Sequence, residues 1–293
     1  MIQPVYVHSA LKGGLMTYTR GWAWQQLILS RRLEYLRSGE ESPNDDFHPD
    51  HDRILMIEHS PVYTLGSGSD DKHLTFLKGD EKSIHIKTRL SKTYRGLDSA
   101  RLSVDRLKTS TPSTCTSLYE IVDCFQSPDS VTTPSGVPIY RVERGGQVTC
   151  HCPGMLVVYP LLDLRREPYK QDLHWYLRCI EEVIIRTLER YSIAGTRDEI
   201  NSGVWVNENK IAAVGVSASR WFSTHGFAIN INPDLSFFDP SIIIPCGLIG
   251  RGVTSMAKEL AVDPPSITHV AGTVVECFRE VFGVSSILSK DIT

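Results

Sequence analysis

Apolar residues at helical spacing predict three amphipathic helices in this chain. They recur every three or four positions over residues 18–37, 169–191 and 267–282, so each segment gains one apolar face. The pattern is clearest in the second segment, whose apolar face holds Leu173, Leu177, Ile180, Ile184, Leu188 and Tyr191. Such a face is stabilised by packing against another layer, so these helices are expected to flank a sheet.

Short apolar runs and alternating patterns predict the strands of that sheet. The predicted strands are residues 5–8, 54–58, 140–143, 156–162, 204–206, 211–216 and 227–231. The fifth and sixth are close enough to form a hairpin through residues 207–209. Helices and strands mix without a strict strand–helix–strand alternation and without an internal repeat. This order predicts an α/β (α+β) fold with a mixed β-sheet core and flanking helices.

One segment, residues 81–136, lacks a lasting pattern. It includes the stretch TSTPSTCTS at 109–117, which is nearly all Ser, Thr and Pro. Such a segment buries too little apolar surface to offset the entropy lost on ordering. We therefore expect one catalytic domain over residues 1–293, with a disordered insertion at 81–136.

Composition and charge then exclude several classes of protein. The 293 residues are 41% hydrophobic, which rules out disorder over the whole chain. The 31 Lys and Arg nearly balance the 34 Asp and Glu, so no basic footprint for nucleic acid is present. No apolar run approaches the roughly 18 residues that would cross a bilayer. Seven cysteines without a secretory signal favour free thiols in a reducing compartment.

The first segment with candidate chemistry is RGGQVTCHCPG, residues 144–154. Paired glycines let a ligand approach the main chain closely. Their amides, together with Arg144 and His151, would suit a carbonyl or phosphate group. A tight turn between two strands would explain the same residues equally well.

The second segment is KIAAVG, residues 210–215. A lysine that enters a strand of small residues can point into a pocket, where burial favours its uncharged form. On composition alone, a solvated lysine beside a hairpin turn explains Lys210 better.

The third segment is IPCGLIGRG, residues 244–252. Cys246 stands between Pro and Gly, on an irregular turn where a thiol would be accessible. Free cysteines are more often small buried side chains, so either role is open for Cys246 at this point.

Metal and nucleotide sites have little support in the sequence. Cys150, His151 and Cys152 are potential ligands, but zinc sites usually space their cysteines by two to four residues, and no second pair matches. Neither a phosphate-binding G-x-x-x-x-G-K-[ST] loop nor a strand followed by G-x-G-x-x-G occurs. We expect no metal and no bound cofactor.

Taken together, these segments resemble the octanoyltransferase, or lipoyl(octanoyl) transferase, family. The resemblance covers most of the chain outside residues 67–139. The matching stretches are YTRGWAWQQL (18–27), EHSPVYTLG (58–66), YRVERGGQVTCHCPGMLVVYPLLDL (140–164), GVWV (203–206), KIAAVGV (210–216), HGFAININ (225–232) and PCGLIGRGVTSM (245–256). Their common order makes chance agreement very improbable.

This resemblance implies an enzyme that moves an octanoyl group from acyl carrier protein to a lysine of a lipoyl domain, on the fold of biotin and lipoate protein ligases. Cys246 matches the nucleophile that forms the acyl thioester, and Lys210 matches the lysine that lowers the pKa of that thiol. The residues that match the acyl-binding stretches are Arg144, Gly145, Gly146, Gln147, Val148, Thr149, Cys150, His151, Ala213, Val214, Gly215, Gly226, Phe227 and Ala228. The reaction needs no ATP, and we expect a monomer.

The chain also departs from the family pattern. Cys150, Cys152 and Met155 stand where an aromatic residue, Gly and Gln are usual, and the side chain of Cys152 predicts an altered acyl pocket. A non-catalytic relative that binds acyl chains or lipoyl domains is therefore one alternative. An ATP-dependent lipoate or biotin ligase is another. Relatives work in the bacterial cytoplasm or in mitochondria, and the Ser/Thr-rich insertion favours mitochondria.

Overall fold

A computed structural model describes residues 4–39, 51–70, 73–77, 130–243, 251–260, 262–284 and 287–291. Most of the predicted insertion, residues 81–129, lies outside the described residues. Its last part is described: residues 130–136 contain strand β4 (Val131–Thr132) and a tight turn. Thr133 closes this turn: its backbone N–H donates to the carbonyl oxygen of Val137 at 2.9 Å, and its hydroxyl oxygen accepts the N–H of Val137 at 3.0 Å.

Within the described residues, eight strands form one large sheet. In spatial order they are β12 (Ile287–Asp291), β1 (Val5–Ser9), β2 (Asp52–Ile57), β7 (Met155–Leu161), β11 (Phe222–Asn230), β10 (Asn209–Ser219), β9 (Val204–Val206) and β8 (Thr196–Arg197). The pairs β12–β1 and β1–β2 are parallel, and the remaining pairs are antiparallel. The predicted mixed sheet is thereby confirmed.

A second, smaller sheet lies beside the large one. Its described strands, in spatial order, are β4, β5 (Pro138–Arg141), β3 (Val62–Leu65) and β6 (Val148–His151). The pair β3–β5 is parallel, whereas β3–β6 and β4–β5 are antiparallel. The glycine-rich turn that the sequence predicts joins β5 to β6 within this sheet.

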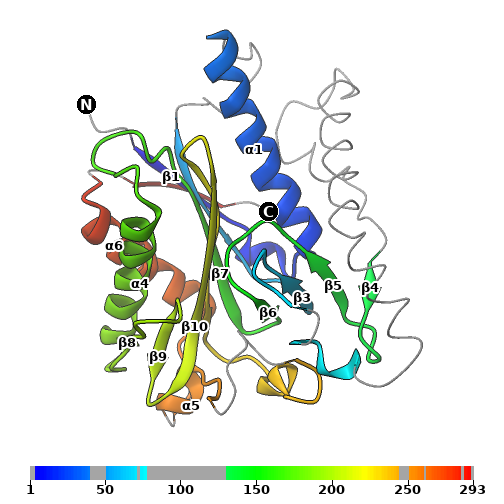
Figure 1. The fold of residues 1–293 in the computed structure, drawn as a ribbon. Helices are drawn as coiled ribbons and strands as arrows, with labels where there is room; N and C mark the ends of the chain where they lie inside the picture. Colours follow the sequence, from blue (N-terminus) through cyan, green and yellow to red (C-terminus); the bar gives the residue numbers. More distant parts are fainter. Residues whose placement is uncertain are drawn as a thin grey trace.

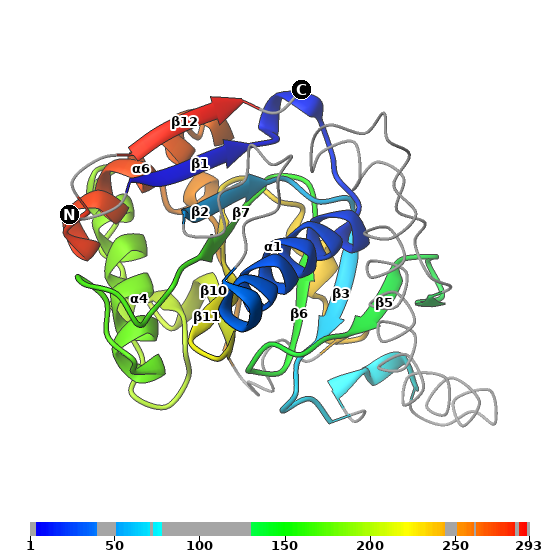
Figure 2. The same cartoon turned by 90° about the horizontal axis from the view of Figure 1, so that it is seen from above.

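Helices cover both faces of the large sheet. The described α-helices are α1 (Tyr18–Ser38), α4 (Leu173–Glu189), α5 (Met256–Leu260) and α6 (Ile267–Phe282). Short 3₁₀ helices span Leu11–Gly13, Thr75–Leu77 and Leu235–Phe238. Helices α4 and α6 pack side by side on one face, while α1 and the small sheet lie on the other (Figures 1 and 2).

Strand alternation divides the core between these two faces. Along β2, Leu55 and Ile57 pack towards α1 and the small sheet, whereas Ile54 and Met56 pack towards α4 and α6. Strand β7 alternates in the same way, and all its residues are buried. Because successive side chains of a strand point to opposite faces, a sheet covered on both sides needs such continuous apolar strands.

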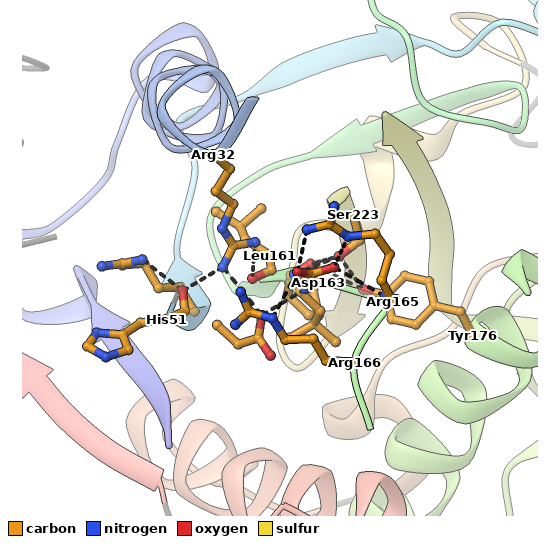
Figure 3. A network of polar contacts seen from close by, with 12 residues as sticks. Arg32, His51, Leu161, Asp163, Arg165, Arg166, Tyr176 and Ser223 are labelled. Carbon is orange, nitrogen blue, oxygen red and sulfur yellow. Dashed lines mark hydrogen bonds and ion pairs between the residues drawn. The ribbon is translucent and has the colours of Figure 1, made fainter. Parts of the chain in front are cut away.

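Arginine–aspartate pairs on buried aspartates hold one end of this core together (Figure 3). Arg32 of α1 donates a hydrogen bond to the carbonyl oxygen of Leu161 at 3.0 Å and pairs with Asp52 at 3.3 Å. Asp163, just after β7, pairs with Arg165 at 2.7 Å and with Arg166 at 3.0 Å. Asp52 also accepts the backbone N–H of Asp163 at 2.7 Å, so the contacts fix α1, β2 and the end of β7 to one another.

No helix in the described ranges combines the length and the apolar character that a membrane crossing requires.

Candidate active site

A cavity of about 220 Å³ lies between the two sheets, where α1 begins. Its walls come from the glycine-rich turn, β6, β7, β10, β11 and the loop before β9. The predicted site residues on its walls are Arg144, Gly146, Gln147, Thr149, His151, Lys210, Ala213, Val214, Gly215, Gly226, Phe227 and Ala228. The fold thus brings together three segments that lie far apart in the sequence. Cys246, the predicted nucleophile, lies outside the described residues.

Three of the predicted acyl-binding residues are not on the cavity wall. Val148 and Cys150 are fully buried in the core, because β6 alternates and turns only Thr149 and His151 towards the cavity. Gly145 instead uses its backbone N–H to hydrogen-bond the carbonyl oxygen of Val216 at 3.0 Å. The structure therefore places these three predicted residues beside the cavity rather than on its wall.

Cys152 also lies away from the cavity wall. It is fully buried in the core, and its Sγ lies 3.7 Å from Sδ of Met155. Neither residue is on the cavity wall. Alternation also turns His151 away from the neighbouring Cys150, so these potential zinc ligands do not converge. Among the described residues, no three His, Cys, Asp or Glu side chains are grouped to hold a metal ion.

Arg144 shapes the glycine-rich turn. Its Nη2 donates to the carbonyl and hydroxyl oxygens of Thr64, both at 2.8 Å, and to the carbonyl oxygen of Gln147 at 2.9 Å. At the end of β3, a Cβ on Gly66 would lie 2.4 Å from the carbonyl oxygen of Gly146. The segment is therefore a tight turn between strands that also forms part of the cavity wall.

Glu143 joins this turn to α1. It accepts hydrogen bonds from Nε1 of Trp22 at 3.2 Å and from Nε2 of Gln26 at 2.6 Å. Nε2 of His225 lies 3.8 Å from the same carboxylate. Burial acts to raise the pKa of Glu143, but His225 and the indole of Trp22 outweigh it and lower that pKa to about 2. Glu143 is therefore ionised at neutral pH.

Beside the predicted His151, the cavity wall contains Tyr18, Tyr159 and His225, which sequence reasoning missed. Tyr18 and His151 stack with ring centroids 6.1 Å apart, and Tyr159 and His225 meet edge to face at 6.4 Å. The hydroxyl of Tyr159 hydrogen-bonds Nε2 of His59 at 2.9 Å. Burial lowers the pKa of His151 and raises those of both tyrosines, so these three side chains are uncharged at neutral pH.

Some polar atoms of this wall are available to a ligand. Each is buried, lines the cavity and has no hydrogen-bond partner within the described part of the chain: the Tyr18 hydroxyl, Oε1 of Gln147 and Nδ1 of His151. A buried polar atom without a partner carries a free-energy cost, which a bound polar group or water would relieve. Tyr18 and His225 stand inside stretches that carry the family resemblance, which is the signal that could have found them.

Lys210 is the second residue of β10 and lies on the cavity wall. Its Nζ donates a hydrogen bond to the carbonyl oxygen of Ser202 at 3.0 Å, and the residue is only 7% exposed. Its backbone N–H donates to Gly252 at 2.9 Å, and its carbonyl oxygen accepts the N–H of Thr254 at 3.0 Å. The interpretation of Lys210 as a solvated lysine, which composition alone favours, is therefore wrong. Residues 252–254, which follow Cys246 in the sequence, run directly beside Lys210.

Comparison with known families gives a consistent result. Residues 126–279 match the lipoyl protein ligase A/B catalytic domain. An octanoyltransferase of a Nostoc species is 37% identical over 273 residues, covering 92% of this chain and 90% of the relative. The octanoyltransferase of Nostoc punctiforme is also 37% identical, over 279 residues that cover 94% of this chain and 89% of the relative.

Solved structures show the same fold at much lower identity. Lipoate-protein ligase A bound with ATP superposes with a TM-score of 0.59 at 13% identity, covering 100% of this chain and 90% of that one. A bi-partite lipoate protein ligase from Thermoplasma acidophilum gives a TM-score of 0.57 at 13% identity, covering 100% and 88%. At this identity the likeness concerns the fold alone, and it confirms the predicted ligase-like architecture.

Proposed function

Since the chain belongs to the octanoyltransferase family of acyltransferases, we propose that it moves an octanoyl group from acyl carrier protein to a lysine of a lipoyl domain, through a thioester on Cys246. One observation carries this proposal. Lys210 is buried on the cavity wall, and its backbone pairs with Gly252 and Thr254, shortly after Cys246 in the chain. The family and its octanoyl-transfer activity give the reaction class; the donor, the intermediate and the acceptor are our inference.

In the proposed first step, the Cys246 thiol loses its proton to the Lys210 amine. A free thiol has a pKa near 8.5, so only a few per cent is thiolate at neutral pH, and a nearby base raises that fraction. The thiolate attacks the carbonyl carbon of the donor thioester, and the carrier sulfur leaves and takes a proton from Lys210. One thioester bond forms and one breaks, so the step is close to thermoneutral.

In the proposed second step, the amine of the acceptor lysine attacks the enzyme thioester. An amide bond forms and the bond to the Cys246 sulfur breaks. The acceptor amine loses a proton to Lys210, which passes it to the Cys246 thiolate, so that the free thiol is restored. This step is downhill because an amide is more stable than a thioester. Neither step consumes ATP. The backbone amides of Gly247 and Leu248 are candidates to hold the developing oxyanion, and both lie outside the described residues.

The cavity walls are suited to an acyl thioester. Val157, Val214 and Phe227 give it an apolar side for the hydrocarbon chain. Gln147 and His151 give it polar atoms for the carbonyl end. Ligand sites commonly combine a mostly apolar wall with a few polar groups that fix the orientation.

The two alternatives have less support. An ATP-dependent ligase shares the fold, but the relatives of about 37% identity are octanoyltransferases, whereas the ligase structures are 13% identical. A non-catalytic relative was suggested by Cys150, Cys152 and Met155. None of the three lines the cavity, while Lys210 does. We therefore favour an active transferase.

We further propose that the protein acts as a monomer and works in the cytoplasm of a bacterium. The cyanobacterial origin of the relatives supports this location, and it gives no support to the mitochondrial location that the sequence favours. Sedimentation equilibrium tests the first point. Tagging the chain in its native host and locating it by microscopy tests the second, since a punctate organellar signal would contradict it.

Intact mass spectrometry tests the proposed reaction. The protein is mixed with octanoyl-acyl carrier protein, alongside Cys246→Ser and, as a matched control, Cys179→Ser in α4. We expect one octanoyl adduct, labile to hydroxylamine, on the wild type and the control but not on Cys246→Ser. The adduct should then move to a lipoyl domain when that domain is added. A wild-type protein that is folded and takes no adduct would overturn the mechanism.

A further inference from the structure

The ring of Trp205 lies against two cationic side chains. Nζ of Lys210 is 4.7 Å from the ring centroid, and Cζ of Arg251 is 3.8 Å from it. Trp205 is in β9, directly across from Lys210 in β10, and only 1% of it is exposed. Cations are attracted to the face of an indole ring, and the attraction grows when water is excluded. Trp205 therefore links the position of Lys210 to that of Arg251.

Arg251 is itself held by two carboxylates. Its Nη1 forms an ion pair with Asp198, and its Nη2 lies 2.9 Å from Oε2 of Glu208. Asp198 also accepts the backbone N–H groups of Ile200 and Asn201, both at 2.8 Å. Arg251, followed by these two backbone groups, lowers the pKa of Asp198, so the ion pair persists far below neutral pH.

Asp198 begins a loop that belongs to the cavity. Ile200, Asn201 and Ser202 all line it, and Ser202 supplies the carbonyl oxygen that receives the hydrogen bond from Lys210. The carboxylate of Asp198 thus connects two segments: the loop at the cavity wall, through its backbone, and the chain after Cys246, through Arg251.

The contacts of Lys210 with Ser202, Trp205 and Gly252 all involve residues whose positions depend on Arg251. Ser202 is in the loop that Asp198 fixes, Trp205 lies under the guanidinium, and Gly252 is the next residue after Arg251. Arg251 itself is not on the cavity wall. Any effect of this residue on the reaction must pass through the groups that it holds.

We propose that Arg251 is a positioning residue for octanoyl transfer, which fixes the Lys210 amine relative to residues 251–254, shortly after Cys246 in the sequence. The inference rests on the proposed function, because it assigns Lys210 the proton-transfer role. A planar guanidinium can stack flat on an indole while its N–H groups pair with two carboxylates in its own plane, and an ammonium group lacks such a plane. Displacing a catalytic group by about 1 Å can slow a reaction by roughly a hundredfold.

The test compares Arg251→Gln and Arg251→Lys with a matched control, Arg190→Gln. Arg190 also forms an ion pair, with Glu280 at 2.8 Å, but it joins α4 to α6 away from the cavity. Three quantities are measured for each protein: the single-turnover rate and half-saturating donor concentration for thioester formation, the pH profile of Cys246 alkylation by iodoacetamide, and the melting temperature.

For Arg251→Gln we expect thioester formation to slow by about tenfold to a hundredfold, with a half-saturating concentration within about twofold of wild type. The alkylation profile should move to higher pH, and Arg251→Lys should recover part of the rate. Arg190→Gln should change neither the rate nor the profile. Asp198→Asn, which keeps Arg251 but breaks its ion pair, should slow the reaction in the same way.

Folded Arg251→Gln that acylates at the wild-type rate would overturn the positioning role, even if its melting temperature falls. A wild-type protein that forms no thioester would instead overturn the proposed function, and the positioning role with it. If Arg251→Gln does not fold, Arg251→Lys and Asp198→Asn decide the matter by the same measurements.

Discussion

Nζ of Lys210 lies 3.0 Å from the carbonyl oxygen of Ser202, to which it donates a hydrogen bond. An amine keeps at least two N–H donors whether it is neutral or protonated, so this bond survives a change in its charge. A carbonyl acceptor also adds no full negative charge beside the lysine. Lys210 can therefore accept and return a proton while its nitrogen stays in place.

Replacing Lys210 should abolish most of the activity while leaving the fold intact. Lys210→Met keeps the length of the side chain but removes the proton acceptor, so we expect octanoyl transfer to slow by about a hundredfold or more. Lys170→Met is the matched control, since Lys170 also lies over a tryptophan ring, 5.8 Å from that of Trp175. Transfer rates and melting temperatures are measured for both. Lys210→Met with near wild-type transfer would exclude Lys210 as the base.

Neighbouring positions of β6 should respond differently to substitution. His151 faces the cavity, so His151→Phe should lower kcat/KM for the donor by about tenfold, the loss expected for one hydrogen bond. Cys150 faces the core, so Cys150→Ala should reduce the free energy of unfolding by about 1 kcal/mol and leave kcat/KM unchanged. Steady-state kinetics and urea unfolding check the two effects. Equal losses of kcat/KM would contradict the assigned faces of the strand.

Gly226 should tolerate no side chain. A Cβ at this position would lie 2.1 Å from the carbonyl oxygen of Val158 and 2.6 Å from Cδ of Pro160, so β11 could not stay paired with β7. We expect Gly226→Ala to lower the free energy of unfolding by roughly 1–3 kcal/mol or more. In α6, a methyl group on Gly272 would have nothing within 4 Å of it, so Gly272→Ala should stabilise the protein by about 0.5–1 kcal/mol. Urea unfolding of both variants tests this opposite behaviour.

Periodicity located the long elements well because their burial is one-sided and extends over many residues. The predicted helix at 267–282 has the observed bounds of α6. The helix predicted from residue 169 begins instead at Leu173, because the carboxylate of Asp172 caps it by accepting the N–H groups of His174 and Trp175. Sequence reasoning missed β3 and β6, which have only four residues each and pair with segments far away in the chain.

The candidate site was predicted by segment better than by residue. The stretches that resemble the family predict that the glycine-rich turn, β10 and β11 contribute to one site. Residues of all three line the cavity. The resemblance of a stretch does not show which of its residues face a ligand. Because side chains alternate along β6, Val148 and Cys150 point into the core. The orientation of Lys210 depends on Ser202 and Trp205, which are contacts that exist only after β9 and β10 pair.

Asp163 should make the stability of the protein depend on pH in acid. Burial acts to raise the pKa of Asp163, but hydrogen bonds and charge from Arg165, together with the charge of Arg166, outweigh it and lower that pKa (Figure 3). A carboxyl whose pKa is lower in the folded protein stabilises the fold fully above its unfolded pKa, about 3.9. This contribution is lost as the pH falls through the folded pKa. Asp163→Asn should therefore melt below the wild type from about pH 5 to 8, with a gap that closes as the pH falls below about 4.

Melting temperatures of the wild type and Asp163→Asn between about pH 2.5 and 8 measure this gap, since these limits lie on either side of the unfolded pKa of about 3.9. Asp263→Asn is the control, because Asp263 is exposed and its replacement should leave the melting temperature nearly unchanged throughout. A gap for Asp163→Asn that stays constant down to the lowest pH would show that packing, and not the charge of Asp163, is responsible. The ion pairs with Arg165 and Arg166 would then contribute little to stability.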